Sequence, residues 1–70
     1  MTVQQKQYLL AYLGYYTGIV GSEWSSDCEK AAVKFQRDYG ISDDKSAGDE
    51  TQMALLYAVT YGMPLRKAGG

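Results

Sequence analysis

The sequence repeats one local pattern three times, and this pattern specifies helices. A short polar residue precedes a Glu or Gln by three positions, and a glycine follows about ten residues later. The three occurrences are Thr2–Gln5, Ser26–Glu29 and Asp49–Gln52, followed by Gly14, Gly40 and Gly62. The polar pair is the capping box of a helix start, and glycine suits the left-handed residue just beyond a helix end. The pattern predicts helices over residues 3–13, 27–39 and 50–61, and therefore an all-α, compact three-helix bundle.

The second and third segments are related by an internal duplication. The turn Tyr16-Thr17-Gly18-Ile19 corresponds to Tyr39-Gly40-Ile41, and the helix start at Cys28 corresponds to the one at Thr51. The offset is 23 residues at the helix starts and one fewer at the turn glycines. Two copies are too few for a solenoid, which needs about three or more repeats to bury a continuous core. We therefore expect two loop–helix repeats packed about a pseudo-twofold axis, with the N-terminal helix laid across them.

Helical periodicity indicates which residues form the core. At about 100° per residue, small and apolar side chains share one face of each expected helix. These faces consist of Val3, Leu10 and Leu13; of Cys28, Ala31, Ala32, Phe35 and Tyr39; and of Thr51, Ala54, Leu55 and Ala58. Cys28 is interpreted as a small buried hydrophobe rather than a nucleophile, because the chain has no histidine to act as its base. The neighbouring carboxylates of Asp27 and Glu29 are also expected to raise the thiol pKa.

Composition argues against several classes of function. A net charge of −1 gives no electrostatic reason to bind nucleic acid or an anionic membrane, and no apolar run approaches the ~20 residues of a membrane-spanning helix. With no histidine and one cysteine, neither a metal site nor a cofactor is expected. A 70-residue bundle has little room for the enclosed cleft in which catalytic carboxylates are tuned, so an enzyme is not expected.

Chain organisation is simple. Residues 1–62 are expected to form one domain, and residues 63–70 a C-terminal tail. The N-terminal residues lead directly into the first expected helix, without the pattern of a signal peptide.

A second set of apolar residues lies off the core stripes. Val33 and Leu56 occupy equivalent positions of the repeat, roughly 140° from their stripes at the usual helical rotation. Met53 and Tyr57 extend the apolar surface further around the third helix. Scattered surface hydrophobes are common, but a helix that is apolar nearly all round usually has a second neighbour. Both interpretations stay open at this point: surface scatter, or a face that docks on a companion domain or a second copy.

Aromatic residues gather at the turns and helix starts rather than in the middle of helices. They are Tyr15, Tyr16, Trp24 and Tyr39. Tyr and Trp are enriched in binding surfaces because they combine an apolar face with a polar tip. The alternative is that Trp24 and one of the tyrosines close the end of the bundle.

An ordered series of motifs resembles the bacterial peptidoglycan-binding domain family. The series is LGYY at 13–16, Trp24, FQRDYG at 35–40 and AGxxT at 47–51. Members of that family are small three-helix modules with this internal repeat, appended to cell-wall hydrolases, amidases and phage endolysins. The resemblance implies a non-catalytic module that binds peptidoglycan, through glycan strand or stem peptide, and anchors an attached wall-hydrolase domain. It also implies a location at the cell wall, extracellular or periplasmic, or in the cytoplasm until lysis for a phage endolysin.

Under this resemblance, the ligand is expected in a shallow cleft between the two repeat units, bounded by the loops at 15–25 and 40–49. The predicted ligand-binding residues are Tyr15, Tyr16, Trp24, Gln36, Arg37, Tyr39, Asp44 and Thr51. The aromatic residues would provide faces for sugar or peptide, and Gln36 and Arg37 polar contacts. Asp44 and the hydroxyl of Thr51 would hold the loop.

The chain departs from the family pattern mainly in its loops. Residues 20–25 read Val-Gly-Ser-Glu-Trp-Ser where the family usually has Val-Asp-Gly-x-Trp-Gly, and Lys45 stands where glycine is usual. Cys28 replaces a threonine, and Lys6 replaces a core leucine, with its stem expected to lie over the bundle edge. The alternative function is a protein-interaction or structural module on the same fold. It would dock through an apolar face made by Val33, Met53, Leu56 and Tyr57.

Overall fold

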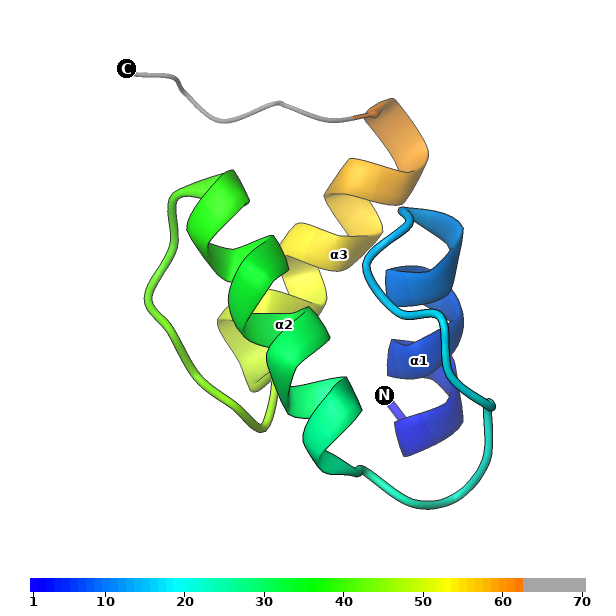
Figure 1. Ribbon diagram of the computed structural model, residues 1–70. Helices are drawn as coiled ribbons and strands as arrows, with labels where there is room; N and C mark the ends of the chain where they lie inside the picture. The colour runs from blue at the N-terminus through cyan, green and yellow to red at the C-terminus, as the bar shows by residue number, and fades with distance from the viewer. Residues whose placement is uncertain (63–70) are drawn as a thin grey trace.

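The computed structural model describes residues 1–62 as three helices packed against one another (Figure 1). Helix α1 spans Val3–Tyr12, α2 spans Ser26–Tyr39 and α3 spans Asp49–Tyr61. No strand occurs within residues 1–62. The all-α three-helix prediction is therefore confirmed, and the bounds agree with expectation to within one residue. The predicted tail at residues 63–70 lies outside the described residues, and the domain boundary at residue 62 stays a prediction.

The helix starts differ from one another in their caps. In α1 the capping box is present: the Gln5 N–H donates to Thr2 Oγ1 at 3.1 Å, and the Thr2 N–H donates to Gln5 Oε1 at 2.8 Å. The predicted boxes at Ser26 and Asp49 are wrong, because the N-cap residues are Ser25 and Gly48 and neither makes a side-chain cap. Acidic residues still occupy the first turns of α2 and α3, where negative charge interacts favourably with the helix dipole.

The glycines beyond the helix ends adopt the positive φ angles that the pattern requires. Gly14, Gly40 and Gly62 have φ of 92°, 86° and 93°. An L-residue with a side chain is strained in this region, so Gly14 and Gly40 allow the chain to turn sharply into the loops that follow α1 and α2.

The core is built from one large side chain of each helix with small residues between them. Leu10, Phe35 and Leu55 are completely buried, and the small residues around them allow the helices to approach closely. The predicted stripes of α2 and α3 are confirmed as far as Phe35 and Ala58, whereas Val3, Leu13 and Tyr39 are only half-buried.

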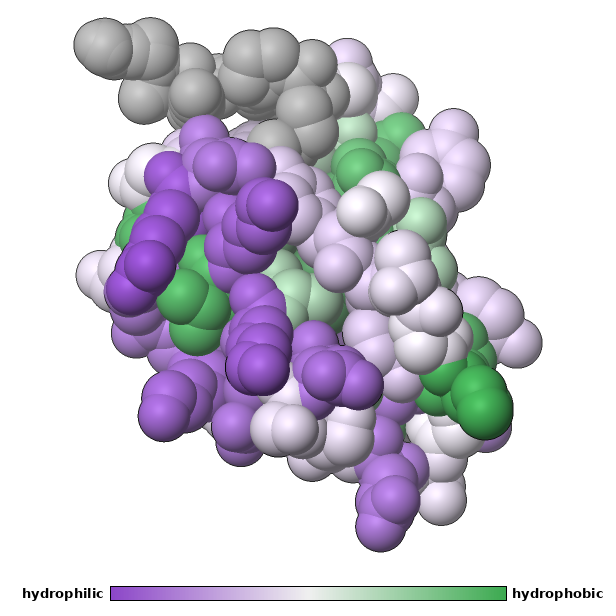
Figure 2. Space-filling view, in the orientation of Figure 1, coloured by the Kyte–Doolittle hydropathy of each residue, from purple (hydrophilic) through white to green (hydrophobic). Residues whose placement is uncertain are grey.

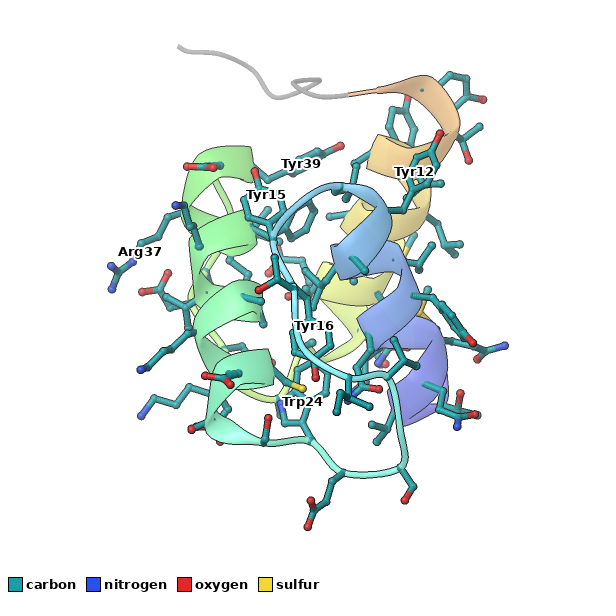
Figure 3. The ribbon with its side chains drawn as sticks, turned by 45° about the vertical axis from the view of Figure 1, so that its right-hand side comes forward. Tyr12, Tyr15, Tyr16, Trp24, Arg37 and Tyr39 are labelled. Carbon is teal, nitrogen blue, oxygen red and sulfur yellow. The ribbon has the colours of Figure 1, made fainter. Side chains whose placement is uncertain are left out.

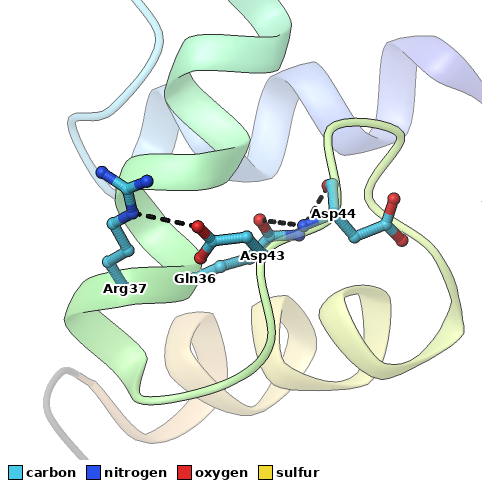
Figure 4. A network of polar contacts seen from close by, with 4 residues as sticks. All are labelled: Gln36, Arg37, Asp43 and Asp44. Atoms are coloured by element: carbon cyan, nitrogen blue, oxygen red, sulfur yellow. Dashed lines mark hydrogen bonds and ion pairs between the residues drawn. The ribbon is translucent and has the colours of Figure 1, made fainter.

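A buried glutamine of α2 clamps the second loop onto the helix that follows it (Figure 4). The Gln36 Nε2–H group donates to the Asp44 carbonyl and to Thr51 Oγ1, both at 2.7 Å. In return, Gln36 Oε1 accepts the Asp44 N–H at 2.8 Å. One amide thus satisfies both backbone groups of a loop residue and the hydroxyl at the start of α3.

Gln7 of α1 performs the same task for the first loop. Its Nε2–H group donates to the Glu23 carbonyl at 2.9 Å and to Cys28 Sγ at 3.2 Å, and its Oε1 accepts the Gly21 N–H at 2.9 Å. Gly21 and Cys28 precede their counterparts Asp44 and Thr51 by 23 residues each, which is the offset of the repeat. The clamped residues therefore follow the repeat, whereas the two glutamines are 29 residues apart and lie on the helices that precede the two loops.

Replacing Gln36 by leucine tests the clamp. Gln36→Leu leaves the backbone groups of Asp44 and the hydroxyl of Thr51 without their partner, and each unsatisfied buried group costs about 1–3 kcal/mol. We expect a loss of roughly 3 kcal/mol in the free energy of unfolding, measured by urea denaturation. Gln4→Leu, on the exposed side of α1, is the matched control and is expected to change stability by less than about 0.5 kcal/mol. Equal stability of Gln36→Leu and the wild type would contradict the assigned role.

The equivalence of Cys28 and Thr51 gives a second test. Cys28→Thr places a hydroxyl, a stronger acceptor than sulfur, beside the Gln7 amide and is expected to preserve or raise stability. Cys28→Val has nearly the same shape but no acceptor, so it is expected to be about 1–2 kcal/mol less stable than Cys28→Thr. Thermal or urea unfolding of the two variants provides the measurement, and indistinguishable stabilities would mean that Gln7 does not need a partner at this position.

Candidate functional site

The first loop is built around Tyr16. Its ring is 6% exposed, and its hydroxyl donates to the Ile19 carbonyl at 2.7 Å, which closes a short turn. Gly18 lies directly against this ring, because a Cβ at Gly18 would be 2.7–2.9 Å from the phenol atoms. Burial, together with the neighbouring Cys28 thiol and the negative charge of Asp27, raises the pKa of Tyr16 above its usual value. Tyr16 therefore stays neutral and forms a fixed wall.

Two open hollows meet at this wall and form a groove between the first loop and the N-terminal half of α2. Their volumes are about 680 and 480 Å³, and they share Tyr16, Gly18 and Asp27. The first hollow is lined by Ile19, Gly21, Ser22, Glu23 and Ser25 in addition, and the second by Tyr15, Thr17, Lys30, Ala31 and Lys34. We call the two hollows together the loop–α2 groove. Its lining combines tyrosine rings, hydroxyl groups, two carboxylates and two ammonium groups.

The exposed side of α2 is strongly polar, as the purple surface over this helix shows (Figure 2). Lys30, Lys34 and Arg37 are all exposed and follow one another at i, i+4 and i+7, so they form a row beside the groove. Arg37 pairs with Asp43 through Nε and Oδ2 at 3.1 Å, and its side chain is 70% exposed. Surface ion pairs of this kind contribute little stability, so the arginine is available for other partners.

The second loop is held tightly by the Asp44 carboxylate. Oδ1 accepts the Ser46 N–H at 3.0 Å and the Ser46 hydroxyl at 2.7 Å, and Oδ2 accepts the Gly48 N–H at 2.9 Å. These bonds stabilise the ionised form and lower the pKa of Asp44. A Cβ at Gly48 would approach Oδ2 to 2.8 Å, so a side chain here would displace the Asp44 carboxylate from its present position. Between them, buried Ala47 adopts φ of 56°, a left-handed conformation that costs a non-glycine residue roughly 1–2 kcal/mol.

Trp24 connects the two loops. Its indole N–H donates to the Lys45 carbonyl at 2.7 Å, and the Lys6 ammonium lies 4.8 Å from the ring centroid. The Lys6 ammonium also donates to the Ser46 carbonyl at 2.9 Å, so its stem crosses the bundle edge as expected. At this point the expected cleft between the loops is therefore occupied by Trp24 itself.

The predicted site residues consequently fall into separate groups (Figure 3). Tyr15 and Tyr39 pack on Phe35 with ring centroids 5.6 and 5.3 Å apart, and the Tyr15 hydroxyl donates to Asp38 Oδ2 at 2.8 Å. Trp24 lies at the opposite end of α2, whose 14 residues correspond to about 21 Å. Gln36 and Thr51 are buried with the second loop, whereas Arg37 and Asp44 are exposed.

Sequence reasoning missed the two lysines and Asp27 as groove residues. Asp27, Lys30 and Lys34 share one helical face, at i, i+3 and i+7. That spacing next to the Tyr-rich loop is the signal that could have identified them. Sequence reasoning also missed the burial of Gln7 and Gln36, because a lone glutamine in an amphipathic helix gives no sign of burial.

The chemistry of Cys28 corrects one expectation. The thiol is buried as predicted, but its pKa lies below the usual value and not above it. Burial by itself raises the pKa, and hydrogen bonds from Gln7 and Ser25 to the sulfur outweigh it.

Neither a metal site nor a membrane span is found in the part of the chain that the structure describes. Residues 1–62 contain no group of His, Cys, Asp or Glu arranged to hold a metal ion. Within the same residues, no helix is long and apolar enough to cross a membrane.

Fold and loops define a small three-helix module with two clamped loop–helix repeats, and its sequence places it in a known family. Residues 2–55 match the family described as "Putative peptidoglycan binding domain". This match covers well over half of the chain, which therefore belongs to the peptidoglycan-binding domain family. Over 45 residues the chain is 36% identical to the N-acetylmuramoyl-L-alanine amidase CwlM of Mycobacterium tuberculosis. The aligned stretch covers 64% of this chain and 11% of that amidase. No solved structure matches the chain.

The lowered pKa of Asp44 predicts a pH-dependent contribution to stability. Because the folded pKa lies below the unfolded value of about 3.9, this contribution is present above about pH 4 and is lost as the pH falls through the folded pKa. We expect Asp44→Asn to be less stable than the wild type at pH 7, and the difference to shrink as the pH falls through the folded pKa of Asp44.

Urea denaturation from about pH 2 to 7 provides the measurement. Asp43→Asn is the neighbouring control, since it breaks only a surface ion pair and should change stability less at neutral pH. A gap between the wild type and Asp44→Asn that stays constant across this range would rule out the charged carboxylate as the cause.

Proposed function

We propose that this chain is a non-catalytic module that binds peptidoglycan and keeps an attached or associated wall-lytic enzyme close to its substrate. The observation that carries the proposal is the family match, which extends over residues 2–55 and includes both loops and the starts of all three helices. The likeness to an amidase supports the link to a lytic enzyme. A module of this kind acts at the cell wall, which it can reach from the extracellular or the periplasmic side.

The loop–α2 groove is the surface we assign to the ligand. Stem peptides of peptidoglycan carry carboxylates and amino groups along a short chain, so a groove that recognises them needs charges of both signs. Lys30 and Lys34 would bind carboxylates, with Arg37 continuing the row, whereas Asp27 and Glu23 would bind an amino group. Tyr15 and Tyr16 would provide apolar walls.

The remaining predicted residues are assigned supporting roles. Gln36, Asp44 and Thr51 hold the second loop through bonds of 2.7–2.9 Å. Trp24 ties that loop to the first one at 2.7 Å and so fixes the rim of the site. Tyr39 packs on Phe35 at the far end of α2 and stabilises the helix that carries the basic row.

The position of the groove agrees with the departures from the family pattern. Gly21 occupies the place where the family usually has aspartate, and it is the counterpart of Asp44. The first loop therefore lacks the carboxylate that closes the second loop around Ser46 and Gly48. The larger hollow lies along this more open loop. The missing carboxylate at Gly21 thus explains both why the first loop is less braced and why it offers a surface to the ligand.

Binding to this site is expected to be modest. The groove is open and shallow, and a small interface offsets little of the entropy lost on association. A modest affinity is sufficient for an anchor, because linkage to an enzyme raises the effective concentration of that enzyme at the wall.

Retention on insoluble peptidoglycan, stripped of teichoic acid, tests both the function and the site. We expect the wild type to sediment with the wall and Lys30→Glu/Lys34→Glu to lose about tenfold or more in apparent affinity, because carboxylates of the ligand would then meet like charge. Added salt should weaken binding of the wild type, since the contacts are exposed.

Lys45→Glu is the control, because it makes a single charge reversal of the same kind in the second loop, outside the groove. Helical circular dichroism verifies that each variant is folded. Full retention of the folded double variant would refute the groove but leave the function standing, whereas a folded wild type that never sediments would refute the function.

A further inference from the structure

The side of the molecule formed by α1 and α3 carries a large uncharged aromatic surface. Its members are Tyr8, Tyr12, Met53, Leu56, Tyr57 and Tyr61, each between 52% and 74% exposed, with Met1 at the edge. We call this set the tyrosine face.

The tyrosine face is continuous across the two helices. On α3, Met53, Leu56 and Tyr57 repeat at i, i+3 and i+4, and they line a hollow of about 310 Å³ with Tyr61. A neighbouring hollow of about 410 Å³ is lined by Met1, Gln5, Tyr8 and Leu9 of the N-terminal segment and by Leu56. Leu56 belongs to both hollows and therefore marks the centre of the face.

Tyr12 extends the same surface. It lies one helical turn beyond Tyr8 on α1, and in Figures 1 and 3 this end of α1 lies beside the second half of α3. The rings of Tyr57 and Tyr61 also contact each other, with centroids 4.6 Å apart and an angle of 45° between the ring planes. Val33, predicted as a further member, is half-buried on α2 and lines neither hollow.

We propose that the tyrosine face pairs two copies of this chain. Exposed tyrosine and methionine without charge is the composition of the core of a protein–protein interface. Residues 51–61 contain no charged residue, and Lys6 of α1 is directed to the second loop, where it donates to Ser46. The charge at the edge of the face is the Met1 ammonium, which donates to Gln52 Oε1 at 3.0 Å. Because the rest of the face is neutral and its hydroxyl groups both donate and accept, it can meet its own copy across a twofold axis with little like-charge repulsion.

The available area fits such a pairing. If an aromatic side chain presents about 150–250 Å² in full, the exposed parts of the four tyrosines sum to roughly 500 Å². Met1, Met53 and Leu56 add exposed apolar area, so the face approaches the roughly 800 Å² that one partner contributes to a standard interface. Met53 and Leu56 at the centre favour a protein partner over a glycan, since aliphatic tips offer neither a stacking plane nor a hydrogen bond to sugar hydroxyls. The proposal is independent of the proposed function, because the tyrosine face and the loop–α2 groove share no residue.

Sedimentation equilibrium of the full chain tests the proposal. We expect the mass to rise from 7.7 kDa towards twice that value as the concentration increases to about 1 mM, and the association to persist in high salt because no charge contributes. Leu56→Lys and Tyr57→Glu should each weaken dimerisation at least about tenfold, because a buried charge without a partner would be placed at the centre of the interface.

Ile19→Glu is the matched control for these variants. Ile19 is 89% exposed but lies in the first loop, away from the tyrosine face, so its charged variant should dimerise like the wild type. Circular dichroism verifies the fold of each variant. A constant mass of 7.7 kDa at every concentration overturns the proposal and leaves the face to a companion domain or to the wall. A dimer that survives both Leu56→Lys and Tyr57→Glu overturns it as well.

Discussion

The structure depends on two buried glutamine amides. A domain of this size buries only about 60% of its unfolded surface, so its apolar core alone gives a narrow margin of stability. The two loops would carry backbone groups without partners next to that core. Gln36 and Gln7 solve this problem in the same way, because a single amide donates to a carbonyl and accepts an N–H of the loop at 2.7–2.9 Å. Glutamine suits this task because its amide combines donor and acceptor on a side chain long enough to leave the helix.

The two repeats share this clamp but differ in what surrounds it. The second loop adds the Asp44 carboxylate, which bonds Ser46 and Gly48 and keeps Ala47 in a left-handed conformation. In the first loop Gly21 takes the place of Asp44, and Trp24 takes the place of Ala47. The loop of the second repeat is therefore compact and closed by hydrogen bonds, whereas the loop of the first repeat is open and lines a hollow of about 680 Å³. If the loop–α2 groove is the ligand site as proposed, this asymmetry separates the repeat that supports the site from the repeat that forms it.

The sequence predicted the elements of this fold better than the residues of its site. The positive φ of Gly14, Gly40 and Gly62 follows from a simple stereochemical rule, and the buried faces of α2 and α3 follow from helical periodicity. The caps of α2 and α3 were placed one residue late, because Ser25 and Ser26 are equally suited to the position and Gly48 gives no side-chain signal. The buried glutamines could not be predicted, since periodicity treats every glutamine as solvent-facing. Gln7 and Gln36 are buried because they hydrogen-bond to loop residues 8–16 positions away along the chain.

The arrangement of surfaces gives the module a way to overcome a weak site. The loop–α2 groove and the tyrosine face belong to different helices, so two chains paired through α1 and α3 would leave both grooves open. A polymeric wall presents many identical sites, and a second binding event on the same polymer is then intramolecular, which can raise the overall affinity by about 10²–10⁴ without any new contact. An open groove with a few charged groups would thus be sufficient for firm retention. Salt is expected to weaken binding at the charged groove and to leave pairing through the tyrosine face intact, so the two proposed associations can be separated by ionic strength.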